Sequence, residues 1–333
     1  ADSGIPSHPF PHQGGKRHPM TMSTNDEFEC AIVGGGPAGL SAALVLGRAR
    51  RRTILLDGEK PRNRVTKHSH GYLTRDGVTP AEFRELAHEE LRKYPTLEYR
   101  HDIVVSVRKD GNRFRLSAKS GRGFSARKII LATGLAETLP GIPGLASYYG
   151  KSLFSCPYCD GYEMRDRPLA VLSDDPYKAA HMAQTLSQWS RDLLVCTNGH
   201  GLSPELQSFL RDNDIPYQES AILSLEGEEG DLQAIRFADG TETARTGGIV
   251  IADWAQAANL HLELGCKLTE AGGIETDEAC RTSVEGVFAA GDAAIVAPAQ
   301  LIVAAAEGSR AAIGVNSDLT HESFHPPIPH FSK

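Results

Sequence analysis

The strongest constraint on how this chain can fold is a glycine-rich turn, GGGPAGL, at residues 34–40. The apolar segment FECAIV precedes this turn, and the helix-forming segment SAALVLGRARR follows it. A second apolar segment, TILLDGE, then carries Asp57, about 20 residues beyond the turn. The order of strand, turn, helix and strand predicts a βαβ unit, and the spacing Gly34-x-Gly36-x-x-Gly39 within it predicts a dinucleotide-binding turn.

Each glycine of this turn has a physical role in such a site. Gly34 permits the tight turn, Gly36 allows the backbone to approach a pyrophosphate, and Gly39 allows the helix and the strand to pack closely. The N-terminus of the helix supplies partial positive charge, and Asp57 can accept hydrogen bonds from ribose hydroxyls. A glycine-rich turn without a ligand is the alternative, and the matching context of strand, helix and Asp57 disfavours it.

Two later segments indicate that the dinucleotide is FAD rather than NAD. LATGL at residues 131–135 follows an apolar strand, and GVFAAGDAA at residues 286–294 places Asp292 between a strand and a helix. Both resemble segments of flavoproteins with two dinucleotide sites, in which such an aspartate binds the ribityl chain. Residues 67–72 follow the strand that ends in Asp57, so we expect them near the flavin ring. His68 and His70 within them are equally compatible with an exposed loop.

The segment SCPYCDG at residues 155–161 predicts redox chemistry. A C-x-x-C spacing brings Cys156 and Cys159 within reach of a disulfide across one helical turn, and a helix start lowers the pKa of a thiol. Asp160 follows the second thiol and can transfer a proton. Half of a zinc site is one alternative, but no second C-x-x-C supplies further ligands. A structural disulfide is the other, and Cys30 is expected to be a small core residue.

The composition limits the class of protein. A chain of 333 residues that is 40% hydrophobic and 23% charged suits a soluble protein of two domains. The net charge of −7 argues against nucleic-acid binding. No apolar run reaches the ~18–20 residues that cross a bilayer. We interpret residues 1–26 as a disordered leader or tag without an export signal, and therefore expect a cytoplasmic protein.

The order of segments predicts an α/β protein in which one domain interrupts another. Pro80 predicts a helix over residues 79–94, because proline is preorganised for the first helical position. A second strand–helix–strand pattern begins at residue 168, and ADG at residues 238–240 predicts a hairpin. We expect two Rossmann-like three-layer domains (ββα and βαβ), with residues 27–144 and 254–320 forming the FAD-binding domain and residues 145–253 the insert.

Taken together, GGGPAGLSAA, ATG, SCPYCDG and EGVFAAGDAA, in this order and spacing, resemble the low-molecular-weight thioredoxin reductase family over residues 28–316. The resemblance implies a homodimer with bound FAD and an inserted pyridine-nucleotide domain that carries the thiols. It makes Cys156 and Cys159 the redox pair and Asp160 the acid. The cofactor contacts that it implies are Gly34, Gly36, Pro37, Ala38, Gly39, Asp57, His70, Ala132, Thr133, Gly134, Gly291, Asp292 and Gln300.

The insert departs from the family pattern where NADPH would bind. Ser173 and Asp175 stand where the family has glycines, and Lys178 replaces a small residue. Side chains at these positions obstruct the approach of backbone to a pyrophosphate, and Asp174 and Asp175 repel its charge. Asp175 can instead cap the helix that begins at Pro176. The next strand is followed by CTNGHGL without an arginine, and Ala299-Gln300 replaces the usual Arg-Gln beside the flavin. The chain is therefore predicted to work without NADPH.

Three functions are compatible with these residues. The first is reduction of a thioredoxin-like disulfide with electrons from another carrier, such as a ferredoxin. The second is oxygen-dependent oxidation of a small-molecule dithiol, and the third is a flavin redox sensor without turnover. Asp160 favours the first, because dithiol oxidases often have histidine there, and the intact C-x-x-C disfavours the third. The tail, residues 321–333, is predicted to be non-helical and to cover the flavin or the thiols.

Overall fold

The computed structural model describes residues 27–324, so the predicted leader and most of the predicted tail lie outside the described residues. The first sheet has the strand order β3-β2-β1-β6-β5-β4, and β17 pairs with β6 beside this path. Its strands are β1 (Glu27–Val33), β2 (Thr53–Asp57), β3 (Leu97–His101), β4 (Val104–Asp110), β5 (Arg113–Ala118), β6 (Gly123–Leu131) and β17 (Val287–Ala289). Strands β1, β2, β3 and β17 are parallel to their neighbours, whereas β4, β5 and the first half of β6 form an antiparallel meander.

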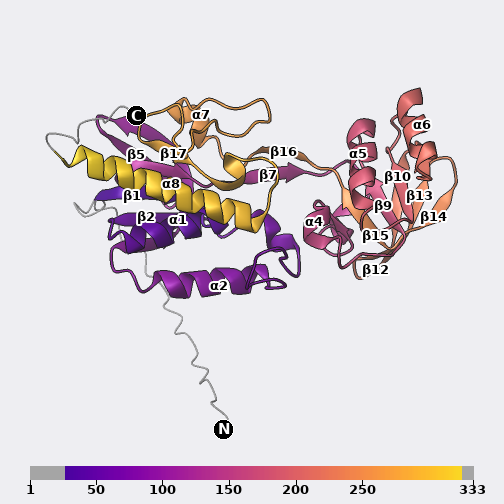
Figure 1. Cartoon of the computed structure of the whole chain (residues 1–333), viewed down its shortest axis with the longest axis horizontal. Helices are drawn as coiled ribbons and strands as arrows, with labels where there is room; N and C mark the ends of the chain where they lie inside the picture. Colours follow the sequence, from indigo (N-terminus) through magenta and orange to yellow (C-terminus); the bar gives the residue numbers. More distant parts are fainter. Residues whose placement is uncertain (1–26, 325–333) are drawn as a thin grey trace, which may run out of the picture.

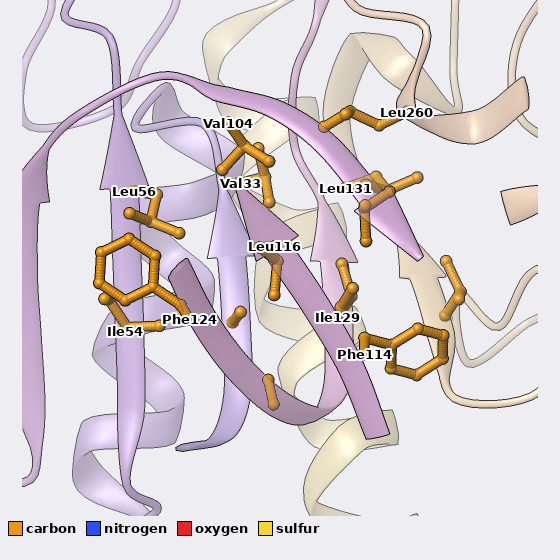
Figure 2. Close-up of a cluster of buried hydrophobic side chains, with 14 of the residues drawn as sticks. Val33, Ile54, Leu56, Val104, Phe114, Leu116, Phe124, Ile129, Leu131 and Leu260 are labelled. Carbon is orange, nitrogen blue, oxygen red and sulfur yellow. The ribbon is translucent and has the colours of Figure 1, made fainter. Parts of the chain in front are cut away.

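Alternation along the buried strands separates two hydrophobic layers. On β1, Ala31 and Val33 face one cluster, and Cys30 and Ile32 face the other. The first cluster packs the parallel strands against the meander, with Leu260 of α7 (Leu260–Leu264) at its edge (Figure 2). The second packs them against helices α1 (Pro37–Arg48), α2 (Pro80–Leu91) and α8 (Leu301–Glu322). Side chains alternate between the faces of a strand, so the parallel strands form the middle of three layers, between the meander and the helices.

A second parallel sheet lies between the two halves of the first unit in sequence. Its order is β11-β10-β9-β15-β8, and a three-stranded antiparallel sheet, β12-β13-β14, covers one face. Helices α5 (Pro176–Leu186) and α6 (Pro204–Asp212) cover the other face. The strands are β8 (Leu153–Phe154), β9 (Leu169–Leu172), β10 (Leu193–Cys196), β11 (Tyr217–Gln218), β12 (Ile222–Glu228), β13 (Asp231–Phe237), β14 (Glu242–Ala244) and β15 (Gly247–Val250).

Two short strands join this inserted unit (residues 139–252) to the first unit. β7 (Leu135–Thr138) pairs with β16 (Asp253–Gln256) in antiparallel register, and the pair runs between the two units (Figure 1). The remaining short elements are η1 (Arg62–Val65), α3 (Leu145–Tyr148), α4 (Pro157–Asp160) and η2 (Gly291–Ala293). This arrangement confirms the predicted α/β class with one Rossmann-like unit inserted into another.

Local predictions can be compared with these elements. The predicted helix over residues 79–94 is α2, capped by the Thr79 side chain, and the ADG turn joins β13 to β14. The prediction of a non-helical tail from residue 321 was wrong for its first two residues, because α8 continues through Glu322. The Glu322 carboxylate pairs there with the buried Lys128 and with Arg127, which holds the last helical turn against β6. The rest of the predicted tail, which includes His325, His330 and Phe331, lies outside the described residues.

Candidate active site

One cavity of about 560 Å³ connects the glycine-rich turn with the thiol pair. It is lined by the end of β1, by the segments that follow β6 and β17, by η1, and by Cys156, Cys159 and Asp160 at α4 of the inserted unit. A volume of this size suits a bound organic cofactor. Every sequence-predicted site residue except Gly39 lines it: Gly34, Gly36, Pro37, Ala38, Asp57, His70, Ala132, Thr133, Gly134, Cys156, Cys159, Asp160, Gly291, Asp292 and Gln300.

The three fingerprint glycines are required for different spatial reasons. Gly34 has φ of +107°, and a Cβ there would lie 2.2 Å from the carbonyl oxygen of Ala132. A Cβ on Gly39 would lie 1.8 Å from the carbonyl oxygen of Gly34, so this glycine brings α1 against the turn without itself reaching the cavity. A Cβ on Gly36 would meet no protein atom within 4 Å. Because Gly36 lines the cavity, its missing side chain leaves room for a ligand.

The residues that the first unit contributes to the cavity fit FAD. Gly36 caps α1 without any side-chain hydrogen bond, so the first N–H groups of this helix are available to a phosphate. The buried Nε of Arg62 has no hydrogen-bond partner among the described residues, and Arg62 lines the cavity. A polar ligand would supply the missing acceptor. The half-buried Asp292 lies on η2 at the same cavity, and desolvation raises its pKa, so hydroxyl donors from a ligand would stabilise its charged form.

Asp57 ends β2, and other groups orient its carboxylate. Arg84 donates from Nη2 to Oδ2 over 2.7 Å, and the backbone N–H of Glu59 donates to Oδ1 over 2.9 Å. Arg84 also donates from Nη1 to the carbonyl oxygen of Gly35 over 2.9 Å. Arg84 therefore connects α2, the glycine-rich turn and the predicted ribose contact. Sequence reasoning missed it, because one basic residue on a polar helix face carries no signal.

The thiols lie where the inserted unit meets the first unit. Cys156 precedes α4 as its N-cap, Pro157 begins the helix, and Cys159 lies in its single turn. Both cysteines are half-buried free thiols. A hydrogen bond from the Cys159 thiol is the main cause that lowers the pKa of Cys156 to about 7, and the same bond raises the pKa of Cys159. Cys156 is therefore the better nucleophile of the pair near neutral pH.

Asp160 lies beside the thiols and is 9% exposed. Burial is the main cause that raises its pKa to about 7, and the negative charges of Cys156 and Glu163 add to the effect. A carboxyl group with this pKa can exist in either protonation state near neutral pH, which suits it to proton transfer. His70 of the first unit approaches Glu163, with 3.7 Å between Nε2 and Oε1.

A second group of residues, which the sequence did not reveal, lies between the thiols and Asp292. Arg62 on η1 pairs with Glu137 of β7 over 2.9 Å and with Asp292 over 3.2 Å. Its guanidinium lies over the Trp254 ring of β16, 4.4 Å from the ring centroid. Glu137 also accepts a hydrogen bond from Tyr149 Oη. Residues this far apart in sequence show no common pattern, so only the folded chain identifies the group.

The turn after β9 makes its own hydrogen bonds. Asp175 caps α5 by accepting from the Lys178 N–H over 3.0 Å, as predicted, and Pro176 is the first helical residue. Ser173 Oγ accepts from the Asp175 N–H over 3.0 Å. Asp174 Oδ1 accepts from the Asn198 amide over 2.8 Å. The Asp175 carboxylate thus satisfies one backbone N–H in the first turn of α5.

Among residues 27–324, no three His, Cys, Asp or Glu side chains gather closely enough to hold a metal ion. Within the same range, no helix combines the length and the apolar character that spanning a membrane requires.

Comparison with known proteins agrees with this geometry. Residues 28–308 match the family model described as pyridine nucleotide-disulphide oxidoreductase. The thioredoxin reductase tcpT of Claviceps purpurea is 34% identical, over 81% of this chain and 88% of that protein. The TrxB structure from Bacillus anthracis is 41% identical with a TM-score of 0.86, over 89% of this chain and all of that one. The structure of HlmI is 35% identical with a TM-score of 0.86, over 90% of this chain and 95% of that one.

These matches show an oxidoreductase, and its family implies bound FAD. The chain therefore belongs to the pyridine nucleotide-disulphide oxidoreductase family, among its thioredoxin-reductase-like members.

Proposed function

We propose that this protein reduces the disulfide of a thioredoxin-like protein through Cys156 and Cys159. The two thiols receive their electrons from FAD, and FAD receives them from a donor other than NADPH. The observation that carries the proposal is the single cavity onto which both thiols, Asp160 and the dinucleotide turn open. Thioredoxin reductases among the relatives support the choice of partner.

The chain's own residues suit thiol–disulfide exchange. The Cys156 thiolate attacks one sulfur of the substrate disulfide, forms a mixed disulfide and releases the other sulfur as a thiolate. Asp160, when protonated, supplies the proton to that thiolate. The Asp160 carboxylate, having given up its proton, accepts the proton of the Cys159 thiol, and the resulting thiolate attacks the Cys156 sulfur. This closes the enzyme disulfide and releases the second substrate sulfur as a thiolate, which takes up the proton from Asp160. The residues around the glycine-rich turn would hold FAD, and the chemistry that bound, reduced FAD would supply is the pair of electrons that restores both thiols.

The turn after β9 supports a donor other than NADPH. Asp175 caps α5 with its own carboxylate, and Asp174 adds a second negative charge beside it. A pyrophosphate at this helix would displace the cap and meet both charges. A one-electron carrier such as a reduced ferredoxin needs no pocket in the inserted unit, so it remains compatible with this turn. We further propose a homodimer, which the family resemblance implies, and a cytoplasmic location.

Anaerobic reduction of the bound flavin tests the donor. We expect reduced ferredoxin to bleach the flavin absorbance and NADPH or NADH to leave it unchanged over the same time. Reduced enzyme should then transfer two electrons to a thioredoxin disulfide, and Cys156→Ser should abolish this transfer. Rapid bleaching by NADPH would overturn the donor assignment. Rapid oxygen consumption with a small dithiol, and none of the thioredoxin reaction, would establish the dithiol-oxidase alternative instead.

A further inference from the structure

One arginine joins both linker strands to the FAD side of the cavity. Glu137 of β7 and Trp254 of β16 lie directly opposite each other in the antiparallel pair, so their side chains share one face. Arg62 contacts both, through the 2.9 Å ion pair and through the Trp254 ring. Its other terminal nitrogen pairs with Asp292. A planar guanidinium can make these three contacts at once, which an ammonium group cannot.

Glu137 extends this connection to the thiol pair. Its Oε2 accepts a hydrogen bond from Tyr149 Oη over 2.8 Å, and its Oε1 accepts from Ser155 Oγ over 3.3 Å. Ser155 immediately precedes Cys156. The Glu137 side chain is only 10% exposed, so water cannot readily replace a lost donor. A shift of Arg62 would therefore disturb the segment that carries the thiols.

A backbone contact brings the inserted unit against the same short helix. Gly150 has φ of +81°, and a Cβ on it would lie 2.3 Å from the carbonyl oxygen of Val65, the last residue of η1. Only glycine allows the turn before β8 to approach this closely. Val65, the last residue of η1, thus contacts the inserted unit, and Arg62, the first residue of η1, contacts the linker strands β7 and β16.

From these contacts we propose that Arg62 is a positioning residue, which holds the inserted unit in the one orientation that opens Cys156 and Cys159 onto the flavin side of the cavity. This inference rests on the proposed thiol–flavin electron exchange. In this role Arg62 keeps the thiol segment in place through its contact with Glu137, which in turn binds Ser155, and Arg62 does not itself react.

Four variants separate this role from its alternatives. Arg62→Gln removes the ion pairs and the contact with Trp254, and Glu137→Gln weakens the connection without changing Arg62 or Asp292. Arg62→Lys keeps the charge but loses the planar fork. Arg75→Gln is the control, because Arg75 is an exposed arginine in the same connection between β2 and α2, and it hydrogen-bonds the carbonyl oxygen of Thr74.

The experiment follows electrons from dithiothreitol to the flavin of the anaerobic holoenzyme. Dithiothreitol closes to its cyclic disulfide, and two electrons pass through the thiol pair to FAD. Rates are expressed per bound flavin. A second assay measures how fast the reduced thiols react with an aromatic disulfide reagent, which requires no flavin. Small-angle X-ray scattering reports the orientation of the two units.

We expect Arg62→Gln and Glu137→Gln to slow flavin reduction by about 10²-fold, because small misplacements of reacting groups have effects of this size. Arg62→Lys should recover only part of the rate, and Arg75→Gln should match the wild type. The thiol reaction should not slow, and scattering from the slow variants should indicate a wider range of orientations.

Two results would overturn the proposal: a wild-type rate of flavin reduction in both Arg62→Gln and Glu137→Gln, or full recovery by Arg62→Lys. If Arg62→Gln does not retain FAD, the rate of Glu137→Gln decides alone. Failure of the proposed function gives a different result, because dithiothreitol would then leave the flavin of the wild-type protein oxidised.

Discussion

At the residue scale, Cys156 and Asp160 lie four positions apart around α4, and the negative charge of Cys156 contributes to raising the pKa of Asp160. The hydrogen bond from Cys159 lowers the pKa of Cys156 to about 7, and burial, with the charges of Cys156 and Glu163, raises that of Asp160 to about 7. Near neutral pH the pair can therefore hold a thiolate and a carboxylic acid at once. This is the combination that a nucleophile and a proton donor require.

A pH profile tests this combination. The Cys156 thiolate fraction rises with pH, while the protonated fraction of Asp160 falls, so the rate of thioredoxin-disulfide reduction by pre-reduced enzyme should peak near pH 7. Asp160→Asn should lower the peak rate by about 10²-fold or more and abolish the fall at alkaline pH. Glu163→Gln is the matched comparison: it removes a charge that raises the pKa of Asp160, so the alkaline fall should move to lower pH. An unchanged profile in Asp160→Asn would exclude the proton-donor role.

At the scale of elements, the starts of α1 and α5 differ although both follow a buried parallel strand. Gly36 leaves the N-terminus of α1 without a side-chain cap, whereas Asp175 caps α5. The first arrangement leaves backbone donors for a ligand, and the second uses one internally. The two helices therefore differ in how many backbone N–H groups of their first turns are left without a partner from the cap.

Removing the cap should weaken α5 locally. Asp175→Ala should cost about 0.5–2 kcal/mol, because one N–H in the first turn loses its acceptor. Hydrogen exchange of the amides in the first turn of α5 measures this loss. Asp174→Asn, which removes the neighbouring charge but keeps an oxygen acceptor, should change exchange far less. Equal effects in the two variants would show that charge, and not capping, controls this turn.

The crossing of α8 over α1 determines the position of the glycine-rich turn. A Cβ on Gly308 of α8 would lie 1.9 Å from the carbonyl oxygen of Ala38, in the first turn of α1. Gly308→Ala should therefore displace α1, lower the free energy of unfolding by about 1–3 kcal/mol and weaken FAD binding. Urea denaturation and titration of apoprotein with FAD measure the two effects. Ala306→Ser, at an exposed position on the same helix, is the control. Wild-type values in Gly308→Ala would contradict the inferred close packing.

At the scale of the whole molecule, one cavity depends on both units. The dinucleotide turn comes from the first unit, the thiols come from the inserted unit, and β7 and β16 are the strands that join them (Figure 1). At this junction Arg62 contacts Glu137, Trp254 and Asp292, so four separate parts of the sequence meet there. The chemistry of the cavity therefore depends on how the units are held together.

Removal of FAD should lower stability mainly in the first unit. A ligand present at about 100 times its Kd stabilises the native state by about 2.7 kcal/mol. Adding FAD to apoprotein should thus raise the melting temperature, and hydrogen exchange should slow around β1, α1 and η2 more than in β9 and α5. Thermal unfolding and exchange measured with and without FAD check both statements. Equal slowing in the two units would show that the cofactor orders the whole chain.

The sequence by itself determined the features whose causes are local. A glycine that must adopt positive φ, a proline that begins a helix, an aspartate that caps one and a C-x-x-C spacing all act within a few residues, so pattern reasoning identified the fold class, the turn, the thiols and the cap of α5. Tertiary structure alone decided what joins these parts. Arg62, Glu137, Trp254 and Asp292 are separated by long stretches of chain, and Arg84 reaches the end of β2 from a different element. Asp57 itself ends strand β2, and Arg84 lies on α2. These contacts exist only because packing of the strands and helices brings the residues together, and no local pattern of residues records that packing.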